Sequence, residues 1–296
     1  MIRSRAGSSS FYSLIVSLLL IAFVLPPAPM QAASTWSVTS TEMAGDAFAP
    51  ASQPTQQVVA HGVIAGEVFD AATGLPLAAA TARLVSLDGA PVAMSQTTTD
   101  ARGRYRLVSA PGLARMVIDK PSYSRSERTA QGIAGQRVAP VDARLTPLDA
   151  NAGPVSAFAG GSVSTGSGDA TLLIPPGGLL DDQLMQLTAI DAQSLIGLPP
   201  AGWSPLAALE ISPPTATFIQ PATLAVAAPA SLAAQATPVA AAWDAQQGVW
   251  RVVDPPARTA DGLRFQLSVS APGQVALFLA DAANAPPAAV IGQPLP

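Results

Sequence analysis

The chain has 296 residues, of which 49% are hydrophobic, 5% aromatic and 11% charged, and it contains 29 Pro, 23 Gly and no Cys. This apolar content excludes a disordered, highly charged chain and is enough to build two or three small domains. The absence of Cys excludes disulfide scaffolds, thiol nucleophiles and thiolate zinc sites. A formal charge of −4 with a single Lys argues against a nucleic-acid binder that neutralises phosphates.

The first segment has the pattern of a secretory signal peptide. Arg3 and Arg5 precede an apolar run over 11–25, and two prolines and several small residues follow it. Such a run is shorter than the roughly 20 helical residues that cross a bilayer, so an uncleaved anchor is the weaker alternative. We predict a signal peptide over 1–33, cleaved after Ala32 or Ala33. The chain then meets the membrane only transiently, through the signal segment, and we expect the mature protein to be periplasmic, on the cell surface or extracellular.

Residues 34–60 are rich in Ser, Thr, Ala, Pro and Gln without a sustained period, which predicts a disordered linker. Alternating β-strand patterns follow over 61–149. In the run 104–109 the two Arg alternate with Tyr105 and Leu107, and further runs place Ala114, Met116 and Ile118, then Val141, Ala143 and Leu145, on one face. Turn residues at Thr73-Gly74, Asp88-Gly89 and 100–103 separate the strands.

Four phrases of this region occur in an order that is specific to one family. They are GEVFDAATGLPLAAATARL at 66–84, TTTDARGRYRL at 97–107, PG at 111–112 and VDARLTPL at 141–148. Together they resemble the carboxypeptidase regulatory-like domain, a small non-catalytic, transthyretin-like β-sandwich that occurs on bacterial surface proteins. The resemblance implies such a sandwich over 61–149. Pro121 departs from the family pattern, because proline there favours the end or the edge of a strand.

A second set of phrases occupies 150–230, where proline closes most of the apolar runs. The recurring features are Ile-Pro-x-Gly-x-Leu, Ser-Pro and Phe-x-x-Pro, at Ile174, Pro175, Gly177, Leu179, Ser204, Pro205, Phe218 and Pro221. This pattern resembles the ZU-five-type β-sandwich of ankyrins, netrin receptors and some bacterial secreted proteins. The resemblance implies a second sandwich with a general role in protein interaction.

The last part of the chain predicts four more strands over 231–282. Trp243 and Trp250 flank a predicted hairpin turn, and Leu263, Phe265, Leu267 and Val269 alternate with polar residues. Four strands make a thin sheet, so this segment either completes the preceding sandwich or packs on it as a companion module. The Pro- and Ala-rich tail over 283–296 resembles the start of another linker. The predicted fold class is therefore all-β, with tandem antiparallel β-sandwiches after a signal peptide.

Residues that could support chemistry are few. His61 is the only His, without a recognisable nucleophile partner, and no catalytic or cofactor-binding motif occurs. The Gly-rich stretch 159–169 lacks the Lys of a phosphate-binding loop and predicts a flexible loop. We therefore expect no enzyme, no cofactor and no metal site. A Ca²⁺ site is the remaining alternative, with Asp169, Asp181, Asp182 and Asp191 as its candidate ligands.

Two functions remain open. The first is a non-catalytic, exported bacterial protein that displays β-sandwiches to bind an unknown protein or envelope component, or to assemble at the cell surface; free strand edges favour it. The alternative is a carbohydrate-binding accessory module in which Trp203, Trp243 and Trp250 stack on the sugar rings of a polysaccharide. That alternative requires two of these rings to be coplanar and exposed on one face, whereas Trp in a small sandwich more often belongs to the core.

Overall fold

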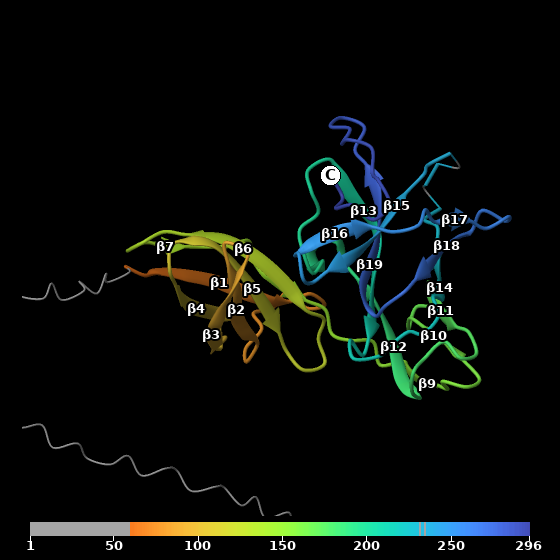
Figure 1. Ribbon diagram of the computed structural model, residues 1–296, viewed down its shortest axis with the longest axis horizontal. Helices are drawn as coiled ribbons and strands as arrows, with labels where there is room; N and C mark the ends of the chain where they lie inside the picture. The colour runs from red at the N-terminus through yellow and green to blue at the C-terminus, as the bar shows by residue number, and fades with distance from the viewer. Residues whose placement is uncertain (1–59, 231, 234) are drawn as a thin grey trace, which may run out of the picture. The chain divides into compact units, whose positions relative to one another are not determined.

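The computed structural model describes residues 60–230, 232–233 and 235–296. The predicted signal peptide (1–33) and all of the predicted linker (34–60) except its last residue lie outside the described residues. In the described part the chain forms two successive β-sandwiches, as predicted (Figure 1). The only helix among these residues is a three-residue 3₁₀ turn, η1 (Ala192–Ser194). No helix in the described part is long and apolar enough to cross a bilayer.

The first sandwich consists of two sheets. In one, β1 (Gly62–Asp70) pairs antiparallel with β4 (Arg104–Ser109) and parallel with the short strands β7 (Arg137–Val138) and β8 (Ala143–Leu145). The other is antiparallel, in the order β3 (Ala90–Thr98), β2 (Thr81–Leu87), β5 (Gly112–Asp119) and β6 (Ser126–Gly132).

The predicted alternation accounts for most of this core. Tyr105 and Leu107 are buried, whereas the Arg residues beside them are exposed. Val141 is an exception, because it is 58% exposed. Val141 lies before β8, which begins at Ala143. The strand is therefore two residues shorter at its start than the alternation predicted. Pro121 lies just after the end of β5, in a turn where Ser122 takes a φ of 65°.

The second sandwich contains a five-stranded and a six-stranded sheet. The five-stranded order is β10 (Gly161–Ser164), β11 (Ala170–Ile174), β14 (Ala222–Ala227), β18 (Arg264–Val269) and β17 (Ala257–Arg258). The six-stranded order is β16 (Val249–Val252), β15 (Val239–Asp244), β19 (Gly273–Ala280), β13 (Trp203–Ser212), β12 (Gln183–Ile190) and β9 (Ala152–Val155). The strands of 231–282 thus complete this sandwich and do not form a companion module.

Three local expectations differ from the structure. Residues 161–164, inside the stretch expected to be a flexible loop, form β10 and pair with β11. Pro205 lies within β13 and not at a strand end, and the pairing of β13 with β19 shifts register there, as at a β-bulge. Leu263, expected to face the core, is 66% exposed because it precedes β18.

The six-stranded sheet is buried on both faces. Leu277 faces the five-stranded sheet, and its neighbour Phe278 faces an outer cluster that also contains Trp203 and Trp250. The C-terminal tail covers this outer cluster. Leu295, only 4% exposed, belongs to it, and the Leu295 N–H donates to the carbonyl of Trp250 at 2.7 Å. Within 283–296, Leu295 is therefore packed against apolar surface that the sheet leaves open, whereas Val290 and Ile291 remain exposed.

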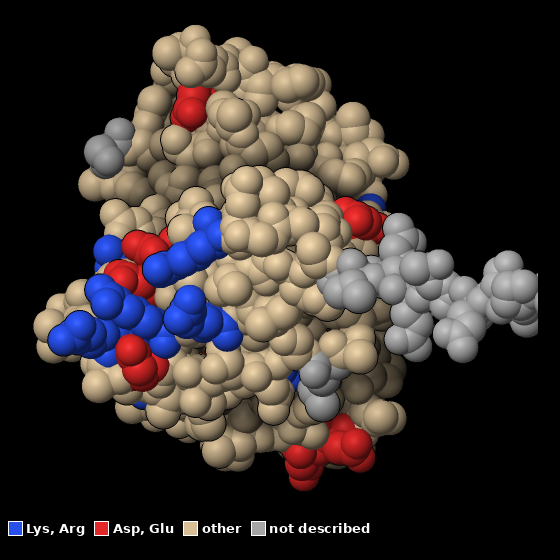
Figure 2. All heavy atoms as spheres, turned by 90° about the vertical axis from the view of Figure 1, so that its left-hand side faces the viewer, with Lys and Arg blue, Asp and Glu red and all other residues tan. Residues whose placement is uncertain are grey.

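Charge is distributed unequally along the chain. Residues 60–149 contain ten basic and eight acidic side chains, whereas 150–296 contain three and nine. Figure 2 shows basic side chains gathered on part of one face, with acidic ones among them. The first sandwich therefore supplies most of the cationic groups that a ligand would meet.

Candidate functional site

The most unusual chemistry of the described residues lies where β6 meets the segment that connects β12 to β13. We call this contact the joint, and define it by Arg115, Glu127 and Arg128 of the first sandwich and by 195–197 and Trp243 of the second. β6 is an edge strand of its sheet. Its Glu127 N–H donates to the carbonyl of Ile196 at 2.5 Å. The connecting segment thus satisfies backbone groups that a free edge would leave exposed.

Arg128 is the central cation of the joint and is 3% exposed. Its Nη1 donates to the carbonyls of Glu127 at 2.8 Å and Ile196 at 3.1 Å, and its Nε donates to the carbonyl of Asp142 at 3.2 Å. Burial lowers the pKa of Arg128 to about 10, although Tyr105 and Asp142 favour the charged form. The charge is thus held mainly by backbone carbonyls, as a buried guanidinium with five donors requires.

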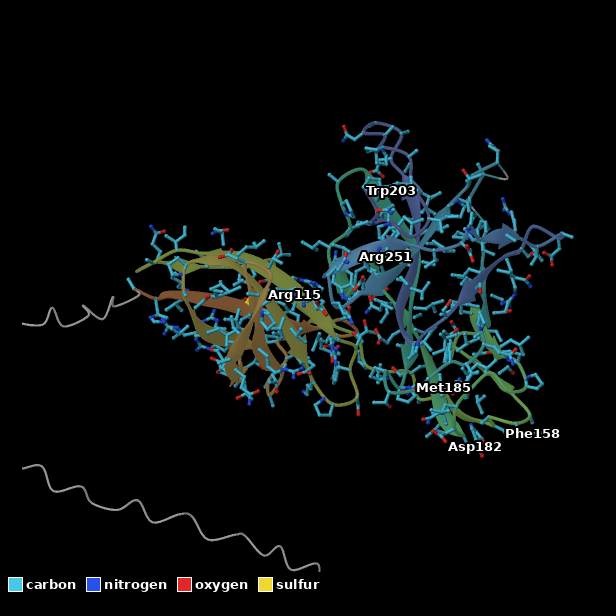
Figure 3. All side chains as sticks on the ribbon, in the orientation of Figure 1. Arg115, Phe158, Asp182, Met185, Trp203 and Arg251 are labelled. Carbon is cyan, nitrogen blue, oxygen red and sulfur yellow. The ribbon has the colours of Figure 1, made fainter. Side chains whose placement is uncertain are left out.

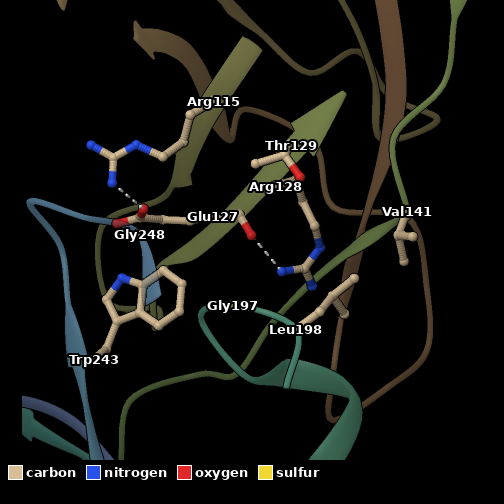
Figure 4. A pocket seen from close by; sticks show the side chains of 9 residues that line it. All are labelled: Arg115, Glu127, Arg128, Thr129, Val141, Gly197, Leu198, Trp243 and Gly248. Atoms are coloured by element: carbon tan, nitrogen blue, oxygen red, sulfur yellow. Dashed lines mark hydrogen bonds and ion pairs between the residues drawn. The ribbon is translucent and has the colours of Figure 1, made fainter. Parts of the chain in front are cut away.

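Glu127 lies beside a second cation of the joint. Arg115 Nη1 is 3.3 Å from Glu127 Oε2 (Figure 4). It also donates to the carbonyl of Ala245 at 2.7 Å. Burial raises the pKa of the Glu127 carboxyl, and the Trp243 indole together with Arg115 and Arg125 partly offsets that rise. A cavity of about 130 Å³ lies among these side chains, with Gly197 and Leu198 on its other wall.

A second buried carboxyl, Glu210, lies on the outer face of the six-stranded sheet. It is 8% exposed and stands directly opposite Gln274 on the neighbouring strand β19. Burial raises its pKa from the ordinary 4.5 to about 7, although Gln274 and Arg125 lower it. Gln274 Oε1 accepts the Ile196 N–H at 2.8 Å, which ties the connecting segment to the sheet.

Glu210 and Gln274 line a groove of about 700 Å³ that adjoins the joint. We call it the joint groove. The first sandwich contributes Asp119, Lys120, Tyr123 and Arg125 to its wall, and the second contributes Trp243 in addition to Glu210 and Gln274. Charged and amide groups therefore converge on one concave surface, which can bind a polar ligand.

The three Trp residues do not form a sugar-stacking face. Trp203 is 7% exposed and Trp250 is 2% exposed. Trp243 is half-buried, and its ring meets Trp250 edge-on at an interplanar angle of 69°. The coplanar, exposed pair that the carbohydrate alternative requires is therefore not present in these three rings. The rings fill the outer cluster and the joint instead.

The candidate calcium ligands are not brought together. Among residues 60–230, 232–233 and 235–296, no three His, Cys, Asp or Glu side chains are close enough to hold a metal ion. Asp182 Oδ1 accepts the Ala157 N–H at 2.7 Å, at an end of the second sandwich where Figure 3 also shows Phe158. His61 is exposed at the start of the first sandwich.

The joint is not evident from the sequence. Glu127, Arg128, Glu210 and Gln274 are polar residues within strands, and only one of them stands out in the sequence. That one is Glu210, in the otherwise apolar run LAALEIS. A charged side chain inside a strand that is buried on both faces is a usable signal, but its partners come from distant parts of the chain.

Comparison with known proteins identifies no family. No family model matches the chain, and no curated protein matches it. Similar solved structures include 3-chlorocatechol 1,2-dioxygenase from Rhodococcus opacus, with 14% identity over 31% of this chain and 61% of that chain and a TM-score of 0.24. A streptococcal ancillary pilin shows 11% identity over 75% of this chain and 51% of that chain, with a TM-score of 0.24. A DUF3823 family protein from Parabacteroides merdae shows 10% identity over 75% and 81%, with a TM-score of 0.23.

The chain thus spans 61% and 51% of the length of the first two of these structures. Identities and TM-scores this low transfer neither catalysis nor pilus assembly to this chain.

Proposed function

We propose that the protein is an exported bacterial, non-catalytic module whose two joined sandwiches bind a protein of the cell envelope or assemble at the cell surface. The observation that carries this proposal is that some strand edges are covered or charged, whereas one is left free and uncharged. Unpaired backbone groups at an edge are a template for strand addition by a partner, and proteins normally cover or charge them.

Two of the edges are covered from within the chain. β6 is covered by the connecting segment through Ile196, and β16 is covered by the tail through Leu295. The edge strand β4 carries two exposed arginines, Arg104 and Arg106. β3 differs from all of these, because it has nine residues and no charged side chain, and among the described residues it pairs only with β2. This edge is the best template for an incoming strand.

We propose that 61–149 is a carboxypeptidase regulatory-like domain and that the second sandwich is related to the ZU-five type. Two short sheets over 62–145, with the motif turns between their strands, support the first assignment. Both resemblances imply binding rather than catalysis, which agrees with a role for the β3 edge.

The experiment compares two matched pairs of lysine substitutions. Ala93→Lys with Gln96→Lys charges two exposed positions of β3, and Thr129→Lys with Gln131→Lys charges two exposed positions of the covered edge strand β6. Envelope proteins that co-purify with the chain are identified, and amide hydrogen exchange of the complex is measured. We expect slower exchange in β3 on binding and loss of the complex in the β3 variant alone. A partner that binds both variants equally, or that leaves the exchange of β3 unchanged, contradicts the proposal.

A further inference from the structure

Three polar atoms around the joint groove are buried without a hydrogen-bond partner among the described residues. They are Glu210 Oε2, Gln274 Nε2 and Trp243 Nε1, none of which makes a hydrogen bond of normal geometry, although Gln274 lies close enough to Glu210, and Trp243 to Glu127, to lower the pKa values of these carboxyls. Glu210 and Gln274 are 8% and 2% exposed, so these atoms have little access to bulk water. A buried donor or acceptor without a partner costs about 1–3 kcal/mol, which makes three of them at one groove a feature that needs an explanation.

The free groups of the groove are mainly donors. Gln274 Nε2 and Trp243 Nε1 can only donate, and the Glu210 carboxyl donates when it is protonated. Arg125 is half-buried at the groove and makes no hydrogen bond or ion pair with the described residues; its charge acts on Glu127 and Glu210 only at longer range. A set of converging donors beside an unpaired guanidinium matches a ligand that only accepts hydrogen bonds.

The remaining charged side chains of the groove either form an ion pair already or add to its preference for an anion. Asp119 is paired with Arg83 at 2.6 Å. Lys120 donates to the carbonyl of Ala78 at 3.0 Å and lies 5.1 Å from the centroid of the Tyr123 ring. The wall from the first sandwich therefore offers a net positive charge to an incoming anion.

We propose that the joint groove binds the carboxylate of an acidic side chain on a protein partner, with Arg125 as its main ligand and Gln274 Nε2 as a second donor. This inference deepens the proposed function and rests on it. A planar carboxylate matches the fork of a guanidinium, and the nearby Glu210 repels its single negative charge less than it would repel the two charges of a phosphate.

A peptide fits the groove better than a sugar does. Sugar recognition uses the exposed face of an aromatic ring, but the half-buried Trp243 ring packs against Gly197 and Trp250. A Cβ atom on Gly197 would lie 2.0 Å from Trp243 Cη2, so the backbone packs against the ring, and Trp250 contacts it edge-on. Pro121, Pro214 and Pro272 add apolar surface to the groove, which suits a short extended peptide.

The test is a titration followed by NMR of the Trp243 indole N–H and the Gln274 side-chain amide in the purified chain. The ligands are acetylated and amidated Gly-Asp-Gly, the matched Gly-Asn-Gly, and glucuronate. We expect saturable shifts with Gly-Asp-Gly only. Arg125→Gln weakens this binding about tenfold or more, as loss of a charge-assisted hydrogen bond implies. Lys120→Gln weakens it less, and Arg106→Gln, exposed on β4 and outside the groove, leaves it unchanged.

Several results overturn the inference. They are the absence of saturation, equal binding of Gly-Asn-Gly, equal affinity in Arg125→Gln and the wild type, or saturation with glucuronate alone. The Lys120→Gln variant keeps the test decisive if Arg125→Gln does not fold. These outcomes are separable from failure of the proposed function, because the β3 lysine variants leave the groove residues intact. A groove that binds no carboxylate while β3 still captures its partner refutes this inference alone.

Discussion

Replacing Glu210 with Gln should change how the stability of the protein depends on pH. Glu210 is 8% exposed, and its carboxyl lies beside Gln274 on the neighbouring strand. Its pKa is raised from 4.5 to about 7, chiefly by burial. Gln has the shape of the protonated carboxyl and cannot ionise, so the variant removes the titration and keeps the packing.

The sign and the size of this pH dependence follow from the linkage between proton binding and folding. Between pH 4.5 and about 7 the folded protein keeps a proton that the unfolded chain has released, so the free energy of unfolding falls as pH rises through this window. Above about pH 7 the Glu210 carboxyl is ionised in both the folded and the unfolded protein, and the loss of stability is complete. At about 1.4 kcal/mol per pH unit, the loss amounts to about 3 kcal/mol. We expect Glu210→Gln to match the wild type near pH 4 and to be about 3 kcal/mol more stable at pH 8.

The assay is urea unfolding of both proteins at a series of pH values, followed by Trp fluorescence and circular dichroism. Other titrating groups contribute equally to both proteins and cancel in the difference between them. Glu67→Gln is the matched control, because Glu67 forms an exposed ion pair with Arg104 and its loss should cost less than about 1 kcal/mol at any pH. A difference between Glu210→Gln and the wild type that is the same at pH 4 and pH 8 would refute the reasoning.

Three further substitutions test the joint and the tail by urea unfolding. Arg128→Met leaves buried carbonyls without their donor and should cost about 2–3 kcal/mol; a loss below about 0.5 kcal/mol would show that water replaces the guanidinium. Gly197→Ala places a methyl group against the Trp243 ring and should cost about 2 kcal/mol, together with a change in Trp fluorescence. Leu295→Ala should cost about 2–3 kcal/mol. Ile291→Ala in the same tail, 55% exposed, should cost less than about 0.5 kcal/mol, and equal losses would argue against a packed tail.

The strands could be predicted because their signals are local. The alternation of Arg and apolar residues over 104–107 reports directly which face is buried, since successive side chains of a strand point to opposite faces. The same pattern does not mark where pairing begins. Val141 and Leu263 continue the alternation of their runs but lie just outside β8 and β18, so they remain exposed.

The tail and the joint could not be predicted, because their partners are distant in the sequence. Arg128 meets a carbonyl at Ile196, 68 residues away, and Trp203 Nε1 donates to the main-chain oxygen of Pro296, 93 residues away. Composition described the tail as Pro- and Ala-rich but carried no information about the apolar surface it covers. Position 210 carried a signal, a lone carboxylate in an apolar run, without indicating which cation or amide would face it.

The outer face of the six-stranded sheet is covered in two chemically different ways, and the difference supports placing the proposed ligand site at the groove. Under the tail the polar atoms have partners: Trp203 Nε1 donates to Pro296 at 2.8 Å, and Trp250 Nε1 donates to Gly197 at 3.0 Å. At the groove, Glu210 Oε2 and Gln274 Nε2 have none among the described residues. Apolar side chains at these two positions would avoid the cost of about 1–3 kcal/mol for each unpaired group. The proposed carboxylate guest would accept a hydrogen bond from Gln274 Nε2, and from the Glu210 carboxyl when that carboxyl is protonated.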